Sequence, residues 1–100
     1  MTKGDILYSE WGYEQTNVDF YKVVDVSKSG KTAIIVELES KKTYTGDMRG
    51  EIVPSDMVKE GAEKIRRKIK NYGWGDFIDL TSYESARLWN GKPKEFTSYA

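Results

Sequence analysis

Two neighbouring runs of alternating apolar residues constrain the fold of this chain more than any other feature of its sequence. Residues 18–26 and 32–38 place β-branched or aromatic side chains at alternate positions, a period of two that is typical of strands. Between them, residues 27–31 are polar and contain Gly30, which tolerates the left-handed conformation of a tight turn. The sequence therefore predicts a long antiparallel hairpin. On its second strand, the face expected to be buried carries Ile34, Val36 and Leu38.

The first strand of this hairpin carries apolar residues on both of its faces. One parity holds Val18, Phe20, Val24 and Val26, interrupted by Lys22, and the other holds Tyr21 and Val23. Because each set follows a period of two, the segment is predicted as a strand.

Shorter strands are predicted on either side of the hairpin. Residues 6–8 and 77–80 each combine apolar residues with flanking turn formers. Residues 51–53 are expected to form a strand that ends at Pro54, because proline cannot donate to a strand ladder. The polar, glycine-containing residues 40–50 predict a loop, and residues 55–61 are expected to be irregular.

Residues 63–72 fit two structures. Ile65, Ile69 and Tyr72 have the spacing of a helical stripe, and lysine and arginine favour helices. The two isoleucines also share one strand parity, and the segment lies between turn-forming residues. The strand is the favoured interpretation.

The C-terminal part predicts one short helix. Residues 81–84 have the threonine-to-glutamate spacing of a capping box, which would start a helix over residues 85–89 that ends at Asn90-Gly91. Together the elements predict a single domain over residues 1–100 of mainly β class. The expected architecture is a small SH3-like or OB-like barrel with one short C-terminal helix, and the alternative is an α+β roll.

The residue content excludes several chemistries. The chain has no cysteine and no histidine, which removes disulfides, thiolate nucleophiles and the commonest metal ligand and general base. We therefore expect no metal, no cofactor and no enzymatic activity. Apolar runs do not exceed four residues, against roughly 20 for a membrane-spanning helix. The expected location is the cytoplasm, with no membrane partner.

A loop rich in aromatic and amide side chains is the first candidate binding surface. It carries Trp11, Tyr13, Gln15 and Asn17. Tryptophan and tyrosine are favoured anchors of protein interfaces, so the loop is a candidate contact for a partner. The alternative is structural, with aromatic rings closing one end of a barrel and amides bonded to the local backbone.

A basic segment is the second candidate. Residues 59–70 hold six basic and two acidic residues in a chain of zero net charge. The candidate contacts are Arg66, Arg67, Lys68 and Lys70, with Trp74 nearby to stack on a base. Such a segment could follow a phosphate backbone or meet an acidic protein surface. The alternative is a solvated strand face without a partner.

Four separated motifs resemble a known family. They are Gly4-Asp5-Ile6, the Trp-Gly-Tyr-x-Gln-Thr-Asn-x-x-Phe-Tyr-x-Val pattern over residues 11–23, Val53-Pro54, and the Ser-Ala-x-x-Trp-x-Gly-x-Pro pattern over residues 85–93. With these motifs the chain resembles a family of small proteins of phages and mobile elements. Small accessory proteins of phages are often inhibitors of host defence, including restriction and CRISPR nucleases. The resemblance implies an origin and sets a prior for function.

These features together predict a non-enzymatic accessory protein of a phage or mobile element. It is expected to bind a host protein or nucleoprotein in the cytoplasm of the host cell and to inhibit a host defence system. The alternative is a nucleic-acid-binding barrel that uses residues 64–74, and an enzyme is the third hypothesis.

Overall fold

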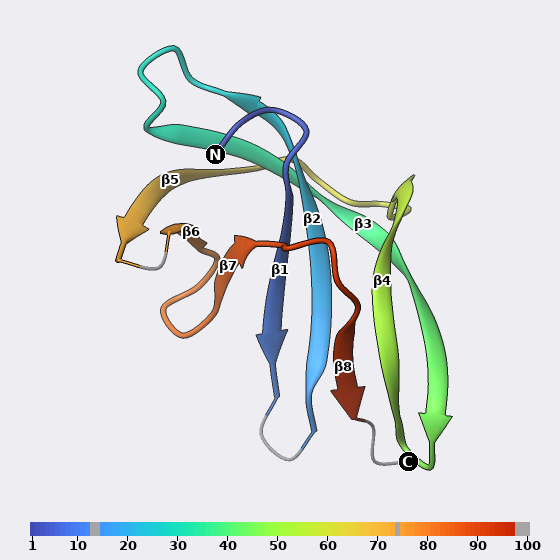
Figure 1. The fold of residues 1–100 in the computed structure, drawn as a ribbon. Coiled ribbons are helices and arrows are strands. Elements are labelled where there is room, and N and C mark those ends of the chain that lie inside the picture. The colour runs from blue at the N-terminus through green and yellow to red at the C-terminus, as the bar shows by residue number, and fades with distance from the viewer. Residues whose placement is uncertain (13–14, 74, 98–100) are drawn as a thin grey trace.

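The described residues form eight strands (Figure 1). The computed structural model describes residues 1–12, 15–73 and 75–97, and no helix occurs among them. The strands are β1 (Ile6–Trp11), β2 (Asn17–Val26), β3 (Thr32–Gly46), β4 (Arg49–Val58), β5 (Ile65–Tyr72), β6 (Gly75–Asp79), β7 (Ser85–Leu88) and β8 (Lys94–Thr97). All of their pairings are antiparallel. The predicted mainly β class is confirmed.

Six of the strands close into a ring. Their hydrogen-bonded order is β2-β1-β7-β6-β5-β3, and β2 also pairs with β3. The ring closes because β3 is 15 residues long: its first part pairs with both β2 and β5. Its remaining part continues out of the ring and pairs with β4, which in turn pairs with β8. A closed ring leaves fewer strand edges exposed than an open sheet.

The hairpin predicted from the alternating runs is confirmed as β2 and β3. Its register pairs Phe20 with Leu38 and Val23 with Ile35, with a bulge between Val23 and Asp25. Val36 and Leu38 are buried as expected. The prediction for Ile34 is wrong, because Ile34 is half-buried while its neighbour Ile35 is fully buried. The face that holds Ile34 is the outer face of the ring, where its partner on β5 is an exposed arginine.

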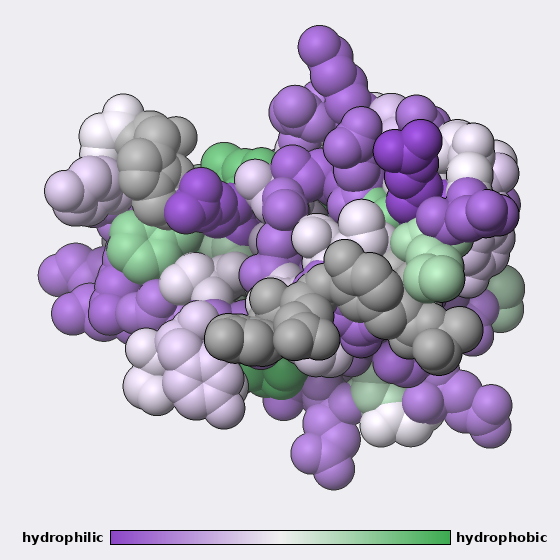
Figure 2. Space-filling view, turned by 90° about the horizontal axis from the view of Figure 1, so that it is seen from below, coloured by the Kyte–Doolittle hydropathy of each residue, from purple (hydrophilic) through white to green (hydrophobic). Residues whose placement is uncertain are grey.

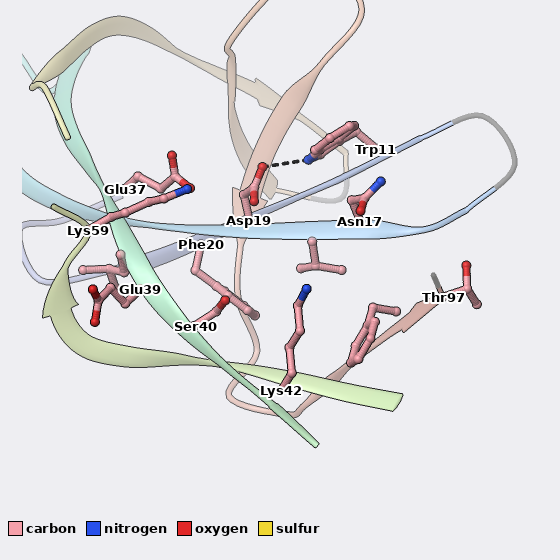
Figure 3. Close-up of a pocket in the computed structure, with 13 residues that line it drawn as sticks. Trp11, Asn17, Asp19, Phe20, Glu37, Glu39, Ser40, Lys42, Lys59 and Thr97 are labelled. Atoms are coloured by element: carbon pink, nitrogen blue, oxygen red, sulfur yellow. Dashed lines mark hydrogen bonds and ion pairs between the residues drawn. The ribbon is translucent and has the colours of Figure 1, made fainter. Parts of the chain in front are cut away.

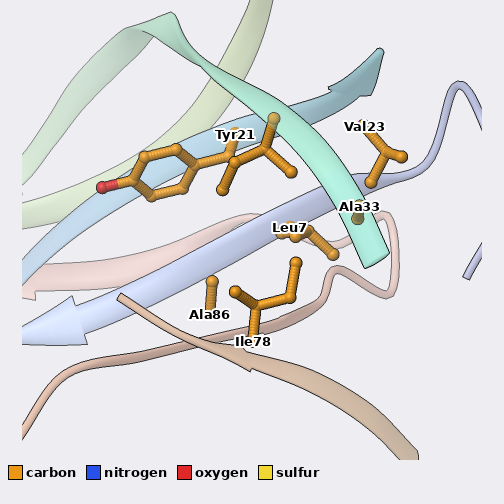
Figure 4. Packing of buried hydrophobic residues seen from close by; sticks show 7 residues of the cluster. Leu7, Tyr21, Val23, Ala33, Ile78 and Ala86 are labelled. Atoms are coloured by element: carbon orange, nitrogen blue, oxygen red, sulfur yellow. The ribbon is translucent and has the colours of Figure 1, made fainter. Parts of the chain in front are cut away.

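Two hydrophobic cores lie on opposite faces of β1, β2 and β3. The inner core fills the ring (Figure 4) and consists of Leu7, Tyr21, Val23, Ala33, Ile35, Ile78 and Ala86. The outer core lies under β4 and β8 and consists of Val18, Phe20, Leu38, Ile52 and Phe96. Successive side chains of a strand point to opposite faces, so the odd positions of β1–β3 supply the inner core and the even positions the outer one. The apolar residues at both parities in residues 18–26 reflect this double burial.

The strand interpretation of residues 63–72 is confirmed by β5, whereas the helix predicted over residues 85–89 is wrong. Residues 85–88 form β7, which pairs with both β1 and β6. Residues 81–84 make a turn closed by a hydrogen bond from the Leu80 amide to the Glu84 carbonyl. The Glu84 carboxylate accepts a hydrogen bond from Ser9 Oγ at 2.8 Å. Because the Glu84 carboxylate bonds to β1, it is not available for the hydrogen bond to the N-cap amide that a capping box requires. Ala86 is buried in the inner core.

The loop predicted over residues 40–50 is also wrong. β3 continues to Gly46, a tight turn with Met48 at a positive φ of 58° follows, and β4 begins at Arg49. The hairpin projects beyond the ring, and residues 39–46 are all exposed, which explains the polar composition of this part of β3. Pro54 does not end β4, which runs on to Val58, so the prediction of an irregular segment from residue 55 is partly wrong. Proline is tolerated there because β8 pairs with β4 only from Arg49 to Ile52 and leaves an open edge at Pro54.

Candidate functional site

A cleft opens where β2 and β3 separate. The two strands pair from Phe20 and Leu38 toward the turn, and on the other side of that pair they diverge (Figure 3). The space between them has a volume of about 430 Å³, and β8 contributes Phe96 and Thr97 to its wall. The start of β2 is attached to β8 by a hydrogen bond from the Thr97 amide to the Thr16 carbonyl, 3.0 Å long. The cleft is therefore built by the β2–β3 hairpin together with β8, which is distant in the sequence.

The inner wall of the cleft is apolar and firmly packed. Val18, Phe20, Leu38 and Phe96 line it and belong to the outer core. The Phe20 ring also packs edge-on against Trp89, with 5.7 Å between ring centroids. Each of these four side chains is at most 5% exposed, so the wall is a preformed floor of the cleft.

The rim of the cleft is charged. Asp19, Glu37 and Glu39 supply carboxylates, and Lys42 and Lys59 supply ammonium groups. Lys59 Nζ lies 3.1 Å from Glu37 Oε2, and this hydrogen bond raises the pKa of Lys59 above its ordinary value. An apolar wall inside a polar rim is the usual anatomy of a protein-binding site.

Trp11 stands at this rim in a fixed orientation. Its Nε1 donates a 2.7 Å hydrogen bond to Asp19 Oδ2 (Figure 3), and 47% of the residue remains exposed. An indole that is anchored by its polar atom and leaves much of its surface exposed can contact a partner at little entropic cost.

The structure places half of the predicted aromatic and amide loop at the cleft. Trp11 and Asn17 face each other as a β1–β2 pair, and both line the cleft. Gln15, which lies between these two residues in the sequence, is half-buried. Tyr13 lies outside the described residues.

The basic segment forms a separate surface on β5. Arg66, Lys68 and Lys70 are exposed and share one strand face, and Arg67 is exposed on the other. Ile65 and Ile69 pack on the inner core. Figure 1 shows β5 beside the first part of β3, at the opposite end of that strand from the cleft. Trp74, which was predicted to assist these cations, lies outside the described residues.

One of the β5 cations is neutralised and the others are not. Lys70 Nζ lies 2.5 Å from Asp79 Oδ2. This contact and a hydrogen bond from Ser85 lower the pKa of Asp79. Arg66 and Lys68 form no ion pair with any described residue. They remain available to an anion.

Most cleft residues were not singled out from the sequence. Phe96, Lys42 and Lys59 reach it from β8, the far half of β3 and the end of β4. No sequence pattern links these positions, because their proximity depends on long-range pairing. The surface seen from below is mostly hydrophilic, with small separate apolar patches (Figure 2).

No cluster of three or more aspartate and glutamate residues suited to a metal ion is found in the described part of the chain. That part also contains no helix of the length and hydrophobicity needed to cross a bilayer.

Tyr21 has the most strongly perturbed acid–base equilibrium among the groups described. Burial raises the pKa of its phenol above the ordinary value, and the nearby carboxylates of Asp19, Glu37 and Glu84 raise it further. The unfolded chain releases this proton at about pH 10, whereas the folded domain retains it. The contribution of Tyr21 to stability is therefore complete below pH 10 and is lost as the pH rises above it.

Replacing Tyr21 by phenylalanine is expected to reduce the decrease in the free energy of unfolding that occurs as the pH rises above 10. The wild type should lose up to about 1.4 kcal/mol per pH unit more than Tyr21→Phe above pH 10, because one proton fewer is released by the folded state. Urea unfolding at pH 8 and pH 11 measures the difference. Tyr83→Phe is the matched control, since Tyr83 is 91% exposed. Equal alkaline losses in wild type and Tyr21→Phe would contradict the assignment.

No protein-family model, curated protein or solved structure matches the chain. The surfaces themselves therefore carry the functional argument.

Proposed function

We propose that this domain is a non-enzymatic binding protein that engages a partner protein through the cleft between β2 and β3. The observation that carries the proposal is the packed apolar wall beside an anchored, half-exposed Trp11 and inside a charged rim. Binding energy in protein interfaces is concentrated in such aromatic anchors beside desolvated pockets.

The biological setting that we propose follows from the family resemblance. The domain is an accessory protein of a phage or mobile element and acts in the cytoplasm of the host cell. Its partner is a host protein or nucleoprotein, and a defence system such as a restriction or CRISPR nuclease is the class of target that the resemblance favours. We also assign the ring of six strands to the small barrels of SH3-like or OB-like kind, which are frequent carriers of binding sites.

Replacing Trp11 by alanine is expected to weaken partner binding by about thirtyfold, the loss typical of an aromatic anchor. The measurement is capture from host lysate, with the wild type and the variant immobilised at equal density. Far-ultraviolet circular dichroism checks that the variant is folded. Tyr83→Ala is the control, because it removes an exposed aromatic ring that does not line the cleft. Equal capture by Trp11→Ala and wild type would reject the proposed site.

A second candidate function is favoured by the unpaired cations of β5. Arg66 and Lys68 lie on an exposed strand face, and each could neutralise one phosphate of a nucleic acid. Phosphate contacts make affinity fall linearly with the logarithm of salt concentration. This surface would act alone or beside the cleft if the partner is a nucleoprotein.

Reversing the β5 charges separates the two functions. In the triple variant Arg66→Glu, Lys68→Glu and Lys70→Glu, the fold should persist because exposed charges contribute little to stability. The second candidate predicts loss of binding to a labelled DNA duplex and removal of capture by nuclease treatment. If the cleft is the binding site, the triple variant should capture a partner protein as well as the wild type does, with and without nuclease. Lys92→Glu, which reverses an exposed charge outside β5, is the control.

A further inference from the structure

The outer half of β3 has one open edge. All eight residues from 39 to 46 are exposed, and β4 pairs with them from one side. On the other side, β2 pairs with β3 only as far as Leu38. The backbone groups along this edge are not paired with any described strand. An open edge of this length is a template for an added strand.

The open edge borders the cleft. The even positions of this half of β3 face Phe96: Lys42 Nζ lies 5.1 Å from the centroid of its ring, and the Tyr44 ring packs edge-on against it at 5.3 Å. Ser40 and Lys42 also line the cleft. A strand added about 4.8 Å from β3 would occupy the space between β3 and the start of β2. Every second side chain of that strand would point toward the apolar wall.

The charges along the edge select its occupant. Lys41 and Lys42 lie near the middle of the edge, and neither has a carboxylate partner among the described residues. A second copy added antiparallel would place these lysines close to their own counterparts, and like charges on facing positions destabilise a pair. Lysine on an edge is a common protection against self-association. Because Glu39 lies at the start of the edge, an added strand avoids this penalty when its acidic side chains lie opposite Lys41 and Lys42 and not beside Glu39.

We propose that this edge and the cleft together form a strand-addition site for an acidic, extended segment of the partner protein. The added segment pairs through its main chain with residues 39–46, places alternate side chains toward the apolar wall beside Phe96, and presents carboxylates to Lys41 and Lys42. Main-chain hydrogen bonds supply affinity in this mode and side-chain pockets supply specificity. The proposal rests on the proposed function and names the chemistry of its partner.

The test titrates the full chain with three terminally blocked octapeptides. NMR spectra follow the amide resonances of the protein during each titration. The first peptide alternates glutamate and valine, the second alternates lysine and valine, and the third is the first with alternate backbone nitrogens methylated. The glutamate peptide is expected to shift the amides of residues 39–46 and the indole of Trp11. The lysine and methylated peptides should each bind at least about tenfold more weakly. Lys42→Glu should weaken the glutamate peptide by a similar factor.

Equal binding of the methylated peptide would overturn the proposal, because it would show that main-chain pairing is not used. Equal binding of the lysine peptide would overturn the choice of an acidic segment. If the amides of residues 39–46 shift when the protein is concentrated without peptide, the occupant of the edge is a second copy of the chain. If Trp11→Ala loses capture of the partner while no peptide shifts the β3 edge, the strand-addition site is rejected and the proposed function stands. If Trp11→Ala retains capture, the proposed function itself is rejected.

Discussion

Replacing Phe20 by alanine is expected to lower the free energy of unfolding by about 3–5 kcal/mol. Phe20 is fully buried in the outer core, where it packs against Trp89 as well as the wall of the cleft. Removal of the ring loses its transfer free energy and leaves a cavity that the neighbouring strands cannot fill. Because domains of this size are stable by about 5–15 kcal/mol, the variant should approach the limit of folding.

Urea unfolding followed by far-ultraviolet circular dichroism measures this loss. Tyr83→Ala is the control, since it removes an aromatic ring that is 91% exposed and should cost less than about 0.5 kcal/mol. A loss for Phe20→Ala below about 1 kcal/mol would show that the outer face of β2 is not a core.

Replacing Ile35 by alanine is expected to cost about 2–5 kcal/mol, and replacing Ile34 should cost clearly less. Ile35 is fully buried inside the ring, whereas Ile34 is half-buried on its outer face. The two residues are adjacent and identical in type, so helix or strand propensity and the size of the deletion are matched. Their difference therefore reports burial alone.

The same unfolding measurement, applied to both variants, decides the orientation of β3. A larger loss for Ile34→Ala than for Ile35→Ala would place the inner face of the ring on the opposite side of the strand. It would also reverse the assignment of side chains that line the cleft, because strand faces alternate along the same backbone.

Local patterns were enough to predict the parts of the fold that depend on neighbouring residues. The β2–β3 hairpin follows from two alternating runs around one turn, and its apolar residues at both parities are explained by burial on both faces. The choice of a strand for residues 63–72 agrees with β5, whose isoleucines pack inward and whose cations remain exposed.

The errors arose where distant pairing overrode local signals. Residues 81–89 carry a helix start signal, yet Glu84 bonds Ser9 and Ala86 enters the inner core, so the segment becomes a strand. Residues 40–50 have the composition of a loop because residues 39–46 of β3 are all exposed. Local propensity is a weak guide in such places, since strand formation depends on partners that the local sequence does not specify.

The same limit applies to the cleft. Residue type alone identified Trp11 and Asn17 as candidate contacts, and both line it. The opposite wall comes from β3, β8 and the end of β4, which meet only after the whole sheet has formed. The β5 cations were identified correctly as an exposed basic group, but the structure separates them from the aromatic residues at the cleft.

Site-specific photo-crosslinking tests the central claim that the partner occupies the cleft. A photoreactive residue is placed at Ser40, which lines the cleft, and in a second variant at Lys68 on the exposed face of β5. Both variants are irradiated in host lysate after their folding has been verified. The account predicts that the partner protein is crosslinked from position 40 and not from position 68. Crosslinking of the partner from position 68 alone would contradict it and assign binding to the basic strand.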